Sequence, residues 1–301
     1  MKTNISLILI LCLLLGACKN GNASSQNKSE TPQDTIKAIK MPAIPQMMTA
    51  PEQRADFLAK HYWDNVNFAD TNYIHHPEVT EQAWADYCDL LNHVPLETAQ
   101  QAMRNVIDRT NVDKKVFTYI TDLADKYLYD PNSPMRNEEF YIPVLEAMIA
   151  SPVLNETEKI RPQARLKLAQ KNRIGTKALN FTYTLASGAQ GSLYQLKAEY
   201  LLLFINNPGC QACTETIEGL KNAPIINQLL QEKKLVLLSI YPDEELDEWK
   251  KHLSEFPNEW INGYDKKFTI KEEQVYDLKA IPTLYLLDKD KTVLLLSLIH
   301  I

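Results

Sequence analysis

The chain has 301 residues, of which 45% are hydrophobic and 23% charged, so its composition is ordinary globular and its length allows two domains. Its formal net charge is −6, from 38 acidic and 32 basic residues, and the sequence contains no long basic run. This balance argues against a nucleic-acid partner. Five cysteines are too few for a disulfide-stapled scaffold of this length, so their positions matter more than their number.

Residues 1–17 have the features of a signal peptide. Lys2 precedes an apolar run from Ile5 to Leu15, which is too short to cross a bilayer comfortably. The run ends in Leu15-Gly16-Ala17-Cys18, which resembles a bacterial lipobox. The resemblance implies that the signal is cut before Cys18 and that lipid such as palmitate is attached to this cysteine. The alternatives are a plain secretory signal with a chance cysteine, or an N-terminal membrane anchor.

Residues 18–50 consist largely of Asn, Ser, Gln, Lys, Thr and Pro. Such a segment buries too little apolar surface to offset the conformational entropy that ordering would cost. We therefore expect a flexible tether between the lipid anchor and the folded part of the chain.

Residues 51–172 predict an all-α domain, because apolar side chains recur there at helical spacing. One stretch that follows the i, i+3, i+4, i+7 pattern consists of Trp84, Tyr87, Cys88 and Leu91. A loop at 130–134 interrupts the pattern, and helices resume near Glu138–Ala150 and Asn155–Lys171. The short connections predict antiparallel neighbours in a bundle of about six helices.

Residues 173–301 predict a layered α/β domain, because strand-like and helix-like patterns alternate. The expected strands are 181–185, 200–205, 235–240, 283–287 and 292–295. The expected helices are 210–222, 244–252 and 272–278.

The motif Cys210-Gln211-Ala212-Cys213 follows one of these buried strands and opens a helix. The free N–H groups and the dipole at a helix N-terminus stabilise a thiolate, which is the species that attacks a disulfide. The spacing leaves the first sulfur exposed and the second about one turn behind it. We therefore predict that Cys210 is the attacking thiol and Cys213 the resolving thiol.

Zinc is the main rival interpretation of this cysteine pair, since a zinc site needs two further Cys or His ligands. Cys88 lies on an apolar helical stripe, which favours a buried core thiol, and His252 lies within a predicted helix. The pair His75-His76 is better explained as a turn before a helix that starts at Pro77. We therefore expect no metal.

With its flanking segments, the cysteine pair resembles a thioredoxin-like domain of the envelope TlpA/ResA type. The residues that carry the resemblance are Leu201 to Ile205, the Cys210–Cys213 motif, and Ala280-Ile281-Pro282-Thr283 before a strand. The resemblance implies a central mixed sheet flanked by helices, a cis Ile281–Pro282 bond beside the cysteines, and substrate binding by Ile281, Pro282 and Thr283. It also implies thiol or disulfide protein substrates, no dissociable cofactor, and a reductant role supplied by a membrane electron donor.

The helical segment carries a second resemblance, through Arg54 to Leu58 and His61-Tyr62-Trp63-Asp64. It resembles the uncharacterised helical domain that precedes thioredoxin-like domains in some envelope lipoproteins of Gram-negative bacteria. The expected protein is thus an all-α domain followed by a thioredoxin-like α/β domain, lipid-anchored in the cell envelope and facing the periplasm. The expected activity is that of a thiol–disulfide oxidoreductase.

The chain departs from the thioredoxin pattern at three positions. Gly209 stands where family members usually have Trp, Phe204 where many have a buried acid, and Glu218 where many have Pro. Glu215 or Glu218 could substitute for the acid, although a solvated charge is the simpler reading of both. The departures support an alternative function: a non-enzymatic envelope binding lipoprotein with a structural Cys210–Cys213 disulfide. A peroxidase is disfavoured, because Asn207-Pro208-Gly209-Cys210 lacks the Thr or Ser such a pocket needs.

The end of the sequence carries one further expectation. A thioredoxin-like fold has a final helix after its last hairpin, yet the chain stops at Ile301, six residues beyond the expected strand 292–295. Leu296 to Ile301 also match the translation of a common sequencing-adapter end. We therefore expect a C-terminally truncated domain over 173–301, in which His300 has no role.

Overall fold

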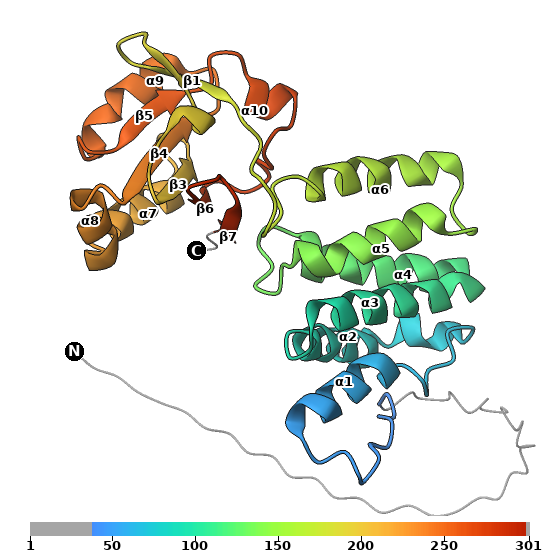
Figure 1. The fold of residues 1–301 in the computed structure, drawn as a ribbon. Coiled ribbons are helices and arrows are strands. Elements are labelled where there is room, and N and C mark those ends of the chain that lie inside the picture. The colour runs from blue at the N-terminus through green and yellow to red at the C-terminus, as the bar shows by residue number, and fades with distance from the viewer. Residues whose placement is uncertain (1–37, 299–301) are drawn as a thin grey trace, which may run out of the picture. The chain divides into compact units, whose positions relative to one another are not determined.

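Six α-helices occupy residues 51–169 in a computed structural model that describes residues 38–298 (Figure 1). Their bounds are Pro51–His61 (α1), Pro77–Leu91 (α2), Leu96–Arg109 (α3), Lys114–Ala124 (α4), Glu138–Ala150 (α5) and Glu156–Ala169 (α6). Short 3-10 turns cover Thr71–His75 and Thr110–Val112, and α4 continues into a π-helical turn, Asp125–Tyr129. The all-α prediction for this segment is confirmed, and α5 packs between α3 and α6.

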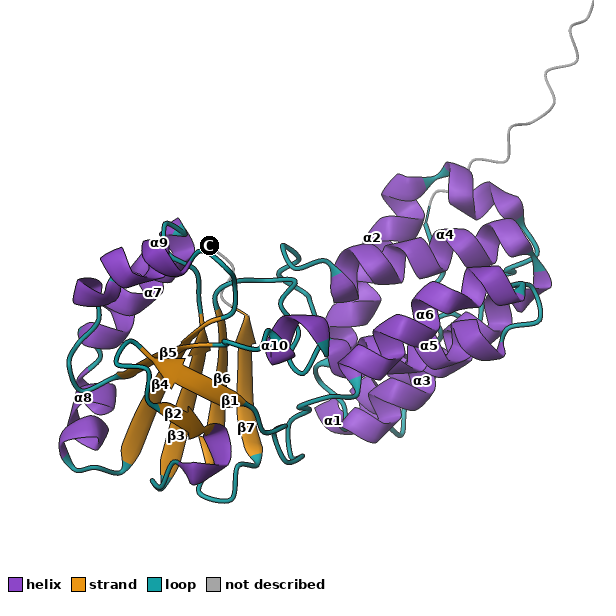
Figure 2. Cartoon of the chain, turned by 90° about the horizontal axis from the view of Figure 1, so that it is seen from above, coloured by secondary structure: helices purple, strands orange, loops and turns teal. Residues whose placement is uncertain are grey.

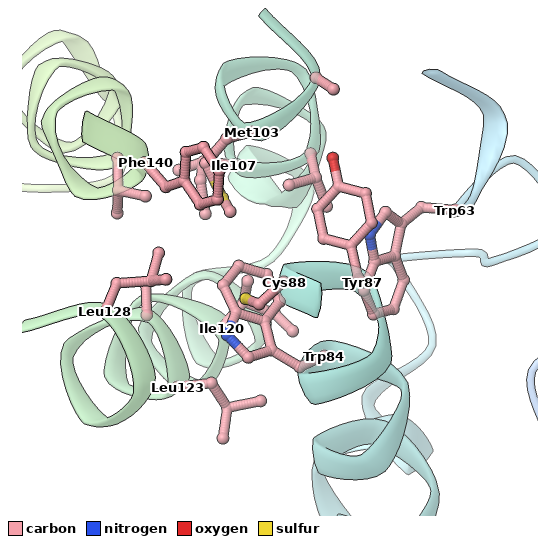
Figure 3. Packing of buried hydrophobic residues seen from close by; sticks show 14 of the residues in the cluster. Trp63, Trp84, Tyr87, Cys88, Met103, Ile107, Ile120, Leu123, Leu128 and Phe140 are labelled. Atoms are coloured by element: carbon pink, nitrogen blue, oxygen red, sulfur yellow. The ribbon is translucent and has the colours of Figure 1, made fainter. Parts of the chain in front are cut away.

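The predicted apolar stripes meet in one core within the helical segment (Figure 3). Trp84, Tyr87 and Cys88 of α2 are each at most 2% exposed, and Met103 of α3 and Ile120 of α4 belong to the same cluster. The interpretation of Cys88 as a buried core thiol is therefore confirmed. Removal of such apolar surface from water, at roughly 25 cal/mol per Å², is the main force that holds these helices together.

Polar side chains just before two of the helices determine where those helices begin. The Asn137 side chain accepts the Phe140 N–H (3.2 Å) at the start of α5. At the start of α6, Asn155 accepts the Glu158 N–H while the Glu158 carboxylate accepts the Asn155 N–H, which forms a capping box. These bonds satisfy backbone donors that have no partner within the helix.

Seven strands form one mixed sheet over residues 182–298, in the order β2-β1-β5-β4-β3-β6-β7 (Figure 2). Their bounds are Thr182–Leu185 (β1), Gln190–Ser192 (β2), Tyr200–Ile205 (β3), Leu235–Tyr241 (β4), Ile261–Tyr264 (β5), Thr283–Asp288 (β6) and Val293–Leu298 (β7). β3, β4 and β5 are parallel neighbours, and the other pairs are antiparallel. The helices of this segment are Gln211–Lys221 (α7), Pro224–Gln231 (α8), Leu246–Lys251 (α9) and Thr269–Glu272 (α10).

The central strands of the sheet are buried on both faces, as the continuous apolar runs predict. Leu201 and Leu203 of β3 point into one core, which also contains Ile270 of α10. Leu202 and Phe204 alternate to the other face, where the side chains of α7 and α8 cover them. The expected mixed sheet flanked by helices is confirmed.

Five short elements differ from the expectation, and one of them is β2, which was not expected. The helix expected at 272–278 is wrong, because α10 ends at Glu272 and Gln274 adopts a left-handed φ of 49° that cannot continue a helix. The helix expected at 244–252 is reduced to α9. Neither α8 nor β5 was expected; β5 contains Asn262 and Gly263, which hide its strand pattern.

Candidate active site

The sheet register brings two distant segments of the chain together. Ile205, the last residue of β3, pairs with Thr283, the first residue of the antiparallel strand β6. The loop that leaves β3 toward Cys210 and the loop that enters β6 through Pro282 therefore start from the same edge of the sheet. The Ile281–Pro282 bond is cis, which confirms that prediction.

Cys210 is the residue that precedes the first turn of α7. Gly209 adopts a φ of +72°, a conformation in which a side chain would be strained, and this turns the chain into the helix. The Cys210 Sγ accepts the backbone N–H of Cys213 (3.2 Å), as an N-cap side chain does. The Cys210 Sγ lies 3.8 Å from the carbonyl oxygen of Ile281, to which the thiol is a weak hydrogen-bond donor. The thiol is half-buried, so one side remains open to a partner.

Cys213 lies one turn behind Cys210 and is only 2% exposed. Burial raises the pKa of the Cys213 thiol well above the ordinary value, and the hydrogen bond with Cys210 acts in the same direction. The backbone N–H of Asn207 acts in the opposite direction. Both cysteines are free thiols in the structure.

The position that holds a buried acid in many thioredoxins is filled by an apolar ring. Phe204 is fully buried and belongs to the same cluster as Cys213. Neither predicted substitute lies in that cluster, since Glu215 and Glu218 are exposed on α7 and accept hydrogen bonds from Gln211 and Lys221. Solvated charge is therefore the correct reading of both glutamates.

Two polar groups next to the site were not singled out from the sequence. The buried Asn206 side chain donates to the Ser239 hydroxyl (2.8 Å) at the carboxyl ends of β3 and β4. Asn207 donates through its side chain to Asp243 (3.0 Å), and Asp243 also accepts from Lys271 of α10 (2.8 Å). The available signal was Asp243, two residues after the end of the buried parallel strand β4, because such strand ends converge at one edge of a sheet.

The other predicted residues lie elsewhere. His75 ends a 3-10 turn before α2, as expected. Within residues 38–298, no group of three or more His, Cys, Asp or Glu side chains is placed to hold a metal ion, and no helix is long and apolar enough to cross a bilayer. Cys18 and its lipobox lie outside the described residues. Of the six terminal residues, Leu296 to Leu298 pair with β6 and 299–301 lie outside the described part.

Comparison with known proteins agrees with this two-part architecture. Residues 17–172 match the family model described as "Domain of unknown function (DUF5106)", and residues 198–293 match a thioredoxin-like family model. A comparison with curated proteins finds no match.

A solved structure extends this agreement to most of the chain. A thioredoxin-like protein from Bacteroides caccae is 84% identical, with a TM-score of 0.85 over 87% of this chain and 95% of that one. The C-terminal domain of an uncharacterized protein from Bacteroides fragilis is 70% identical over 42% of this chain and 89% of that one, with a TM-score of 0.41. A domain of a possible thiol-disulfide isomerase from Cytophaga hutchinsonii is 27% identical over 43% and 86%, with a TM-score of 0.37. Because the DUF5106 family model matches more than half of the chain, the chain belongs to that family, and its helical domain is followed by a thioredoxin-like domain.

Proposed function

We propose that the protein is a thiol–disulfide oxidoreductase that acts on disulfides of cell-envelope proteins through Cys210 and Cys213. One observation carries the proposal. The half-buried Cys210 thiol stands at the start of α7, where it accepts the Cys213 N–H (3.2 Å) and faces the Ile281 carbonyl (3.8 Å). A thiol in such a place combines access with stabilisation of its thiolate.

The proposed reaction consists of two exchanges. The Cys210 thiolate attacks one sulfur of a substrate disulfide, so a Cys210–substrate S–S bond forms and the substrate S–S bond breaks, releasing one substrate thiolate. The Cys213 sulfur then attacks Cys210, forms the Cys210–Cys213 disulfide and releases the second substrate thiolate. Two electrons pass from the cysteine pair to the substrate, and the two protons of the cysteine thiols end on the substrate sulfurs.

The surroundings of Cys213 support this order of events. Because burial raises its pKa, Cys213 remains a thiol while Cys210 reacts first. The Asn207 N–H favours the thiolate that the second step requires. Phe204 places no carboxylate behind Cys213, so we propose that solvent accepts the Cys213 proton and returns a proton to the released substrate thiolate.

We further propose that the reaction runs in the reductive direction, supplied by a membrane electron donor, and that a lipid on Cys18 anchors the protein facing the periplasm. The lipobox-like Leu15-Gly16-Ala17-Cys18 and the polar residues 18–50 support the anchor. Two or more acyl chains, at about 0.8 kcal/mol per buried methylene, would make it stable. Cys18→Ala should move the protein from the membrane fraction to the soluble fraction and abolish incorporation of labelled palmitate. Cys12→Ala, in the same signal segment, is the matched control and should change neither.

The exchange itself is tested with Cys213→Ser, which cannot resolve the first intermediate. This variant should accumulate a mixed disulfide with its substrate through Cys210, visible on a non-reducing gel, whereas the double variant with Cys210→Ser should not. Alkylation at neutral pH should label Cys210 faster than Cys213. Faster labelling of Cys213 would show that the roles are assigned the wrong way round.

The apolar surroundings of Cys213, including Phe204, favour one rival: a binding lipoprotein in which the two cysteines form a structural disulfide. The reduction potential of the pair separates the two functions. Structural disulfides have potentials below about −300 mV, whereas pairs active in exchange lie higher. A potential below that limit, together with no exchange on any disulfide, would favour the rival.

A further inference from the structure

Four charged side chains form a closed ring between the helical domain and the loop that enters β6. The helical domain contributes Arg136 and Glu138, and the loop contributes Asp277 and Lys279; all four belong to one compact unit of the chain. The Glu138 carboxylate accepts from Arg136 (2.8 Å) and Lys279 (3.2 Å). The Asp277 carboxylate accepts from the same two cations, at 3.5 and 2.6 Å. Each cation thus touches both anions, and the ring is neutral.

The ring is shielded from water. The Arg136 side chain is only 4% exposed, and its Nε and Nη1 atoms are buried without a hydrogen-bond partner among the described residues. The Nη2 bonds to Glu138 and Asp277 are therefore the polar contacts that hold this guanidinium. The Lys279 ammonium lies 3.7 Å from the centre of the Tyr129 ring, a cation–π contact that also comes from the helical domain. Loss of one member would leave a poorly solvated charge without its partner.

The chain just before this loop is also held from the helical side. The buried Asn172 side chain donates to the Val275 carbonyl (2.8 Å), and the Lys171 ammonium donates to the Gln274 carbonyl (2.7 Å). Residues 274–279 are thus fixed at two places by side chains that precede β1. These bonds replace the helix that the sequence suggested here.

Residues 274–279 lead directly to the loop beside the cysteine pair. Lys279 stands two residues before Ile281, whose carbonyl faces the Cys210 thiol at 3.8 Å. The Lys279 backbone N–H also donates to Asp277 (3.0 Å), and the Thr283 hydroxyl donates to the Ala280 carbonyl. An anchor at Asp277 and Lys279 therefore limits how far the Ile281 carbonyl can move relative to Cys210.

We propose that Arg136 and Glu138 are positioning residues for the thioredoxin-like site: through Asp277 and Lys279 they hold the loop against which a peptide disulfide docks beside Cys210. This inference rests on the proposed function and gives the helical domain a part in it. A substrate with an extended backbone next to its disulfide should depend on the held loop. A small disulfide that only needs to reach the Cys210 sulfur should not.

The first experiment compares two substrates in the full chain: insulin, whose disulfides lie in peptide backbone, and 5,5′-dithiobis(2-nitrobenzoate), a small disulfide. Arg136→Met should lower the rate constant with insulin by about tenfold and leave that with the small disulfide within about twofold. Glu138→Gln removes one charge but keeps hydrogen-bonding capacity, so it should give a smaller loss. Arg104→Met breaks the exposed Arg104–Asp108 pair of α3 and, as the matched control, should change neither rate. An equal fall with both substrates, or no fall with insulin, overturns the inference.

The second experiment does not depend on activity. Amide hydrogen exchange in 277–281 should become about tenfold faster in Arg136→Met and remain unchanged in Arg104→Met, because only the first releases the loop. Unchanged exchange in Arg136→Met overturns the inference even if activity falls. If the parent chain reacts with neither disulfide, the proposed function fails instead. The amide hydrogen-exchange rates alone then decide whether Arg136 holds the loop.

Discussion

Two thiols in different parts of the molecule are equally buried and differently surrounded. Cys88 of α2 and Cys213 of α7 are each 2% exposed. Cys88 belongs to an apolar cluster that includes Trp84 and Ile120 (Figure 3), and burial raises its pKa. Cys213 has the same burial but also touches the Cys210 sulfur and the Asn207 N–H. Burial makes a thiol inert, and a reactive partner within reach gives it a role in chemistry.

The largest expected effect separates the two regions by activity. Cys210→Ser removes the attacking sulfur, so disulfide exchange should fall to the background rate. Cys88→Ala removes the thiol of the helical core, and exchange should stay within about twofold of the parent, because that thiol touches no reacting atom. Both are measured as the rate of insulin reduction with a chemical reductant as electron source. Full activity in Cys210→Ser would show that Cys210, like Cys88, has no role in disulfide exchange.

A smaller effect appears in the pH dependence of stability. The folded-state pKa of Cys88 is raised above its ordinary value of 9.0, so the unfolded chain loses this proton at lower pH. Cys88 therefore contributes stability that is fully present below its ordinary pKa and is lost progressively as pH rises from there toward the raised folded-state pKa, at up to about 1.4 kcal/mol per pH unit. Urea unfolding between about pH 8 and about pH 10 should show a shallower decline in Cys88→Ala than in the parent. Equal slopes would mean that Cys88 is less buried than the structure places it.

The smallest effect concerns the charged pair beside the active site. Asp243→Asn keeps a side-chain oxygen that can accept the hydrogen bond from Asn207, but it removes the negative charge that faces Lys271. The Asp243–Lys271 ion pair is partly exposed. Solvent screening keeps the loss of stability small. The rate at which Cys213 resolves the mixed disulfide should fall by about twofold, since Asn207 is held less firmly. Asp247→Asn, in the exposed Asp247–Lys250 pair of α9, is the control and should change neither quantity.

The sequence was most informative where structure is local. Helical spacing of apolar residues located α2 and the core position of Cys88, and an apolar run followed by Cys-x-x-Cys located β3 and the start of α7. The cis Ile281–Pro282 bond beside the cysteines came from resemblance to a family and not from spacing. Local patterns succeed because propensity and periodicity act within a few residues of chain.

Local pattern failed in the segment between α10 and β6. The expected helix at 272–278 is absent because Asn172 and Lys171, about a hundred residues earlier in the chain, hold the Val275 and Gln274 carbonyls instead. The sequence pattern does not predict strand β5, because this strand is stabilised by pairing with its neighbours β1 and β4 and not by the strand propensity of its own residues.

The sequence by itself determined the two-domain order, most helices, the central strands and the cysteine pair at a helix start, because each depends on neighbours along the chain. Only the tertiary structure decided that Ile281 faces Cys210 and that Arg136 and Glu138 close a ring with Asp277 and Lys279. These contacts join residues 71 and 141 positions apart. Their formation depends on the sheet register and on the packing of the two domains, which no pattern within one segment encodes.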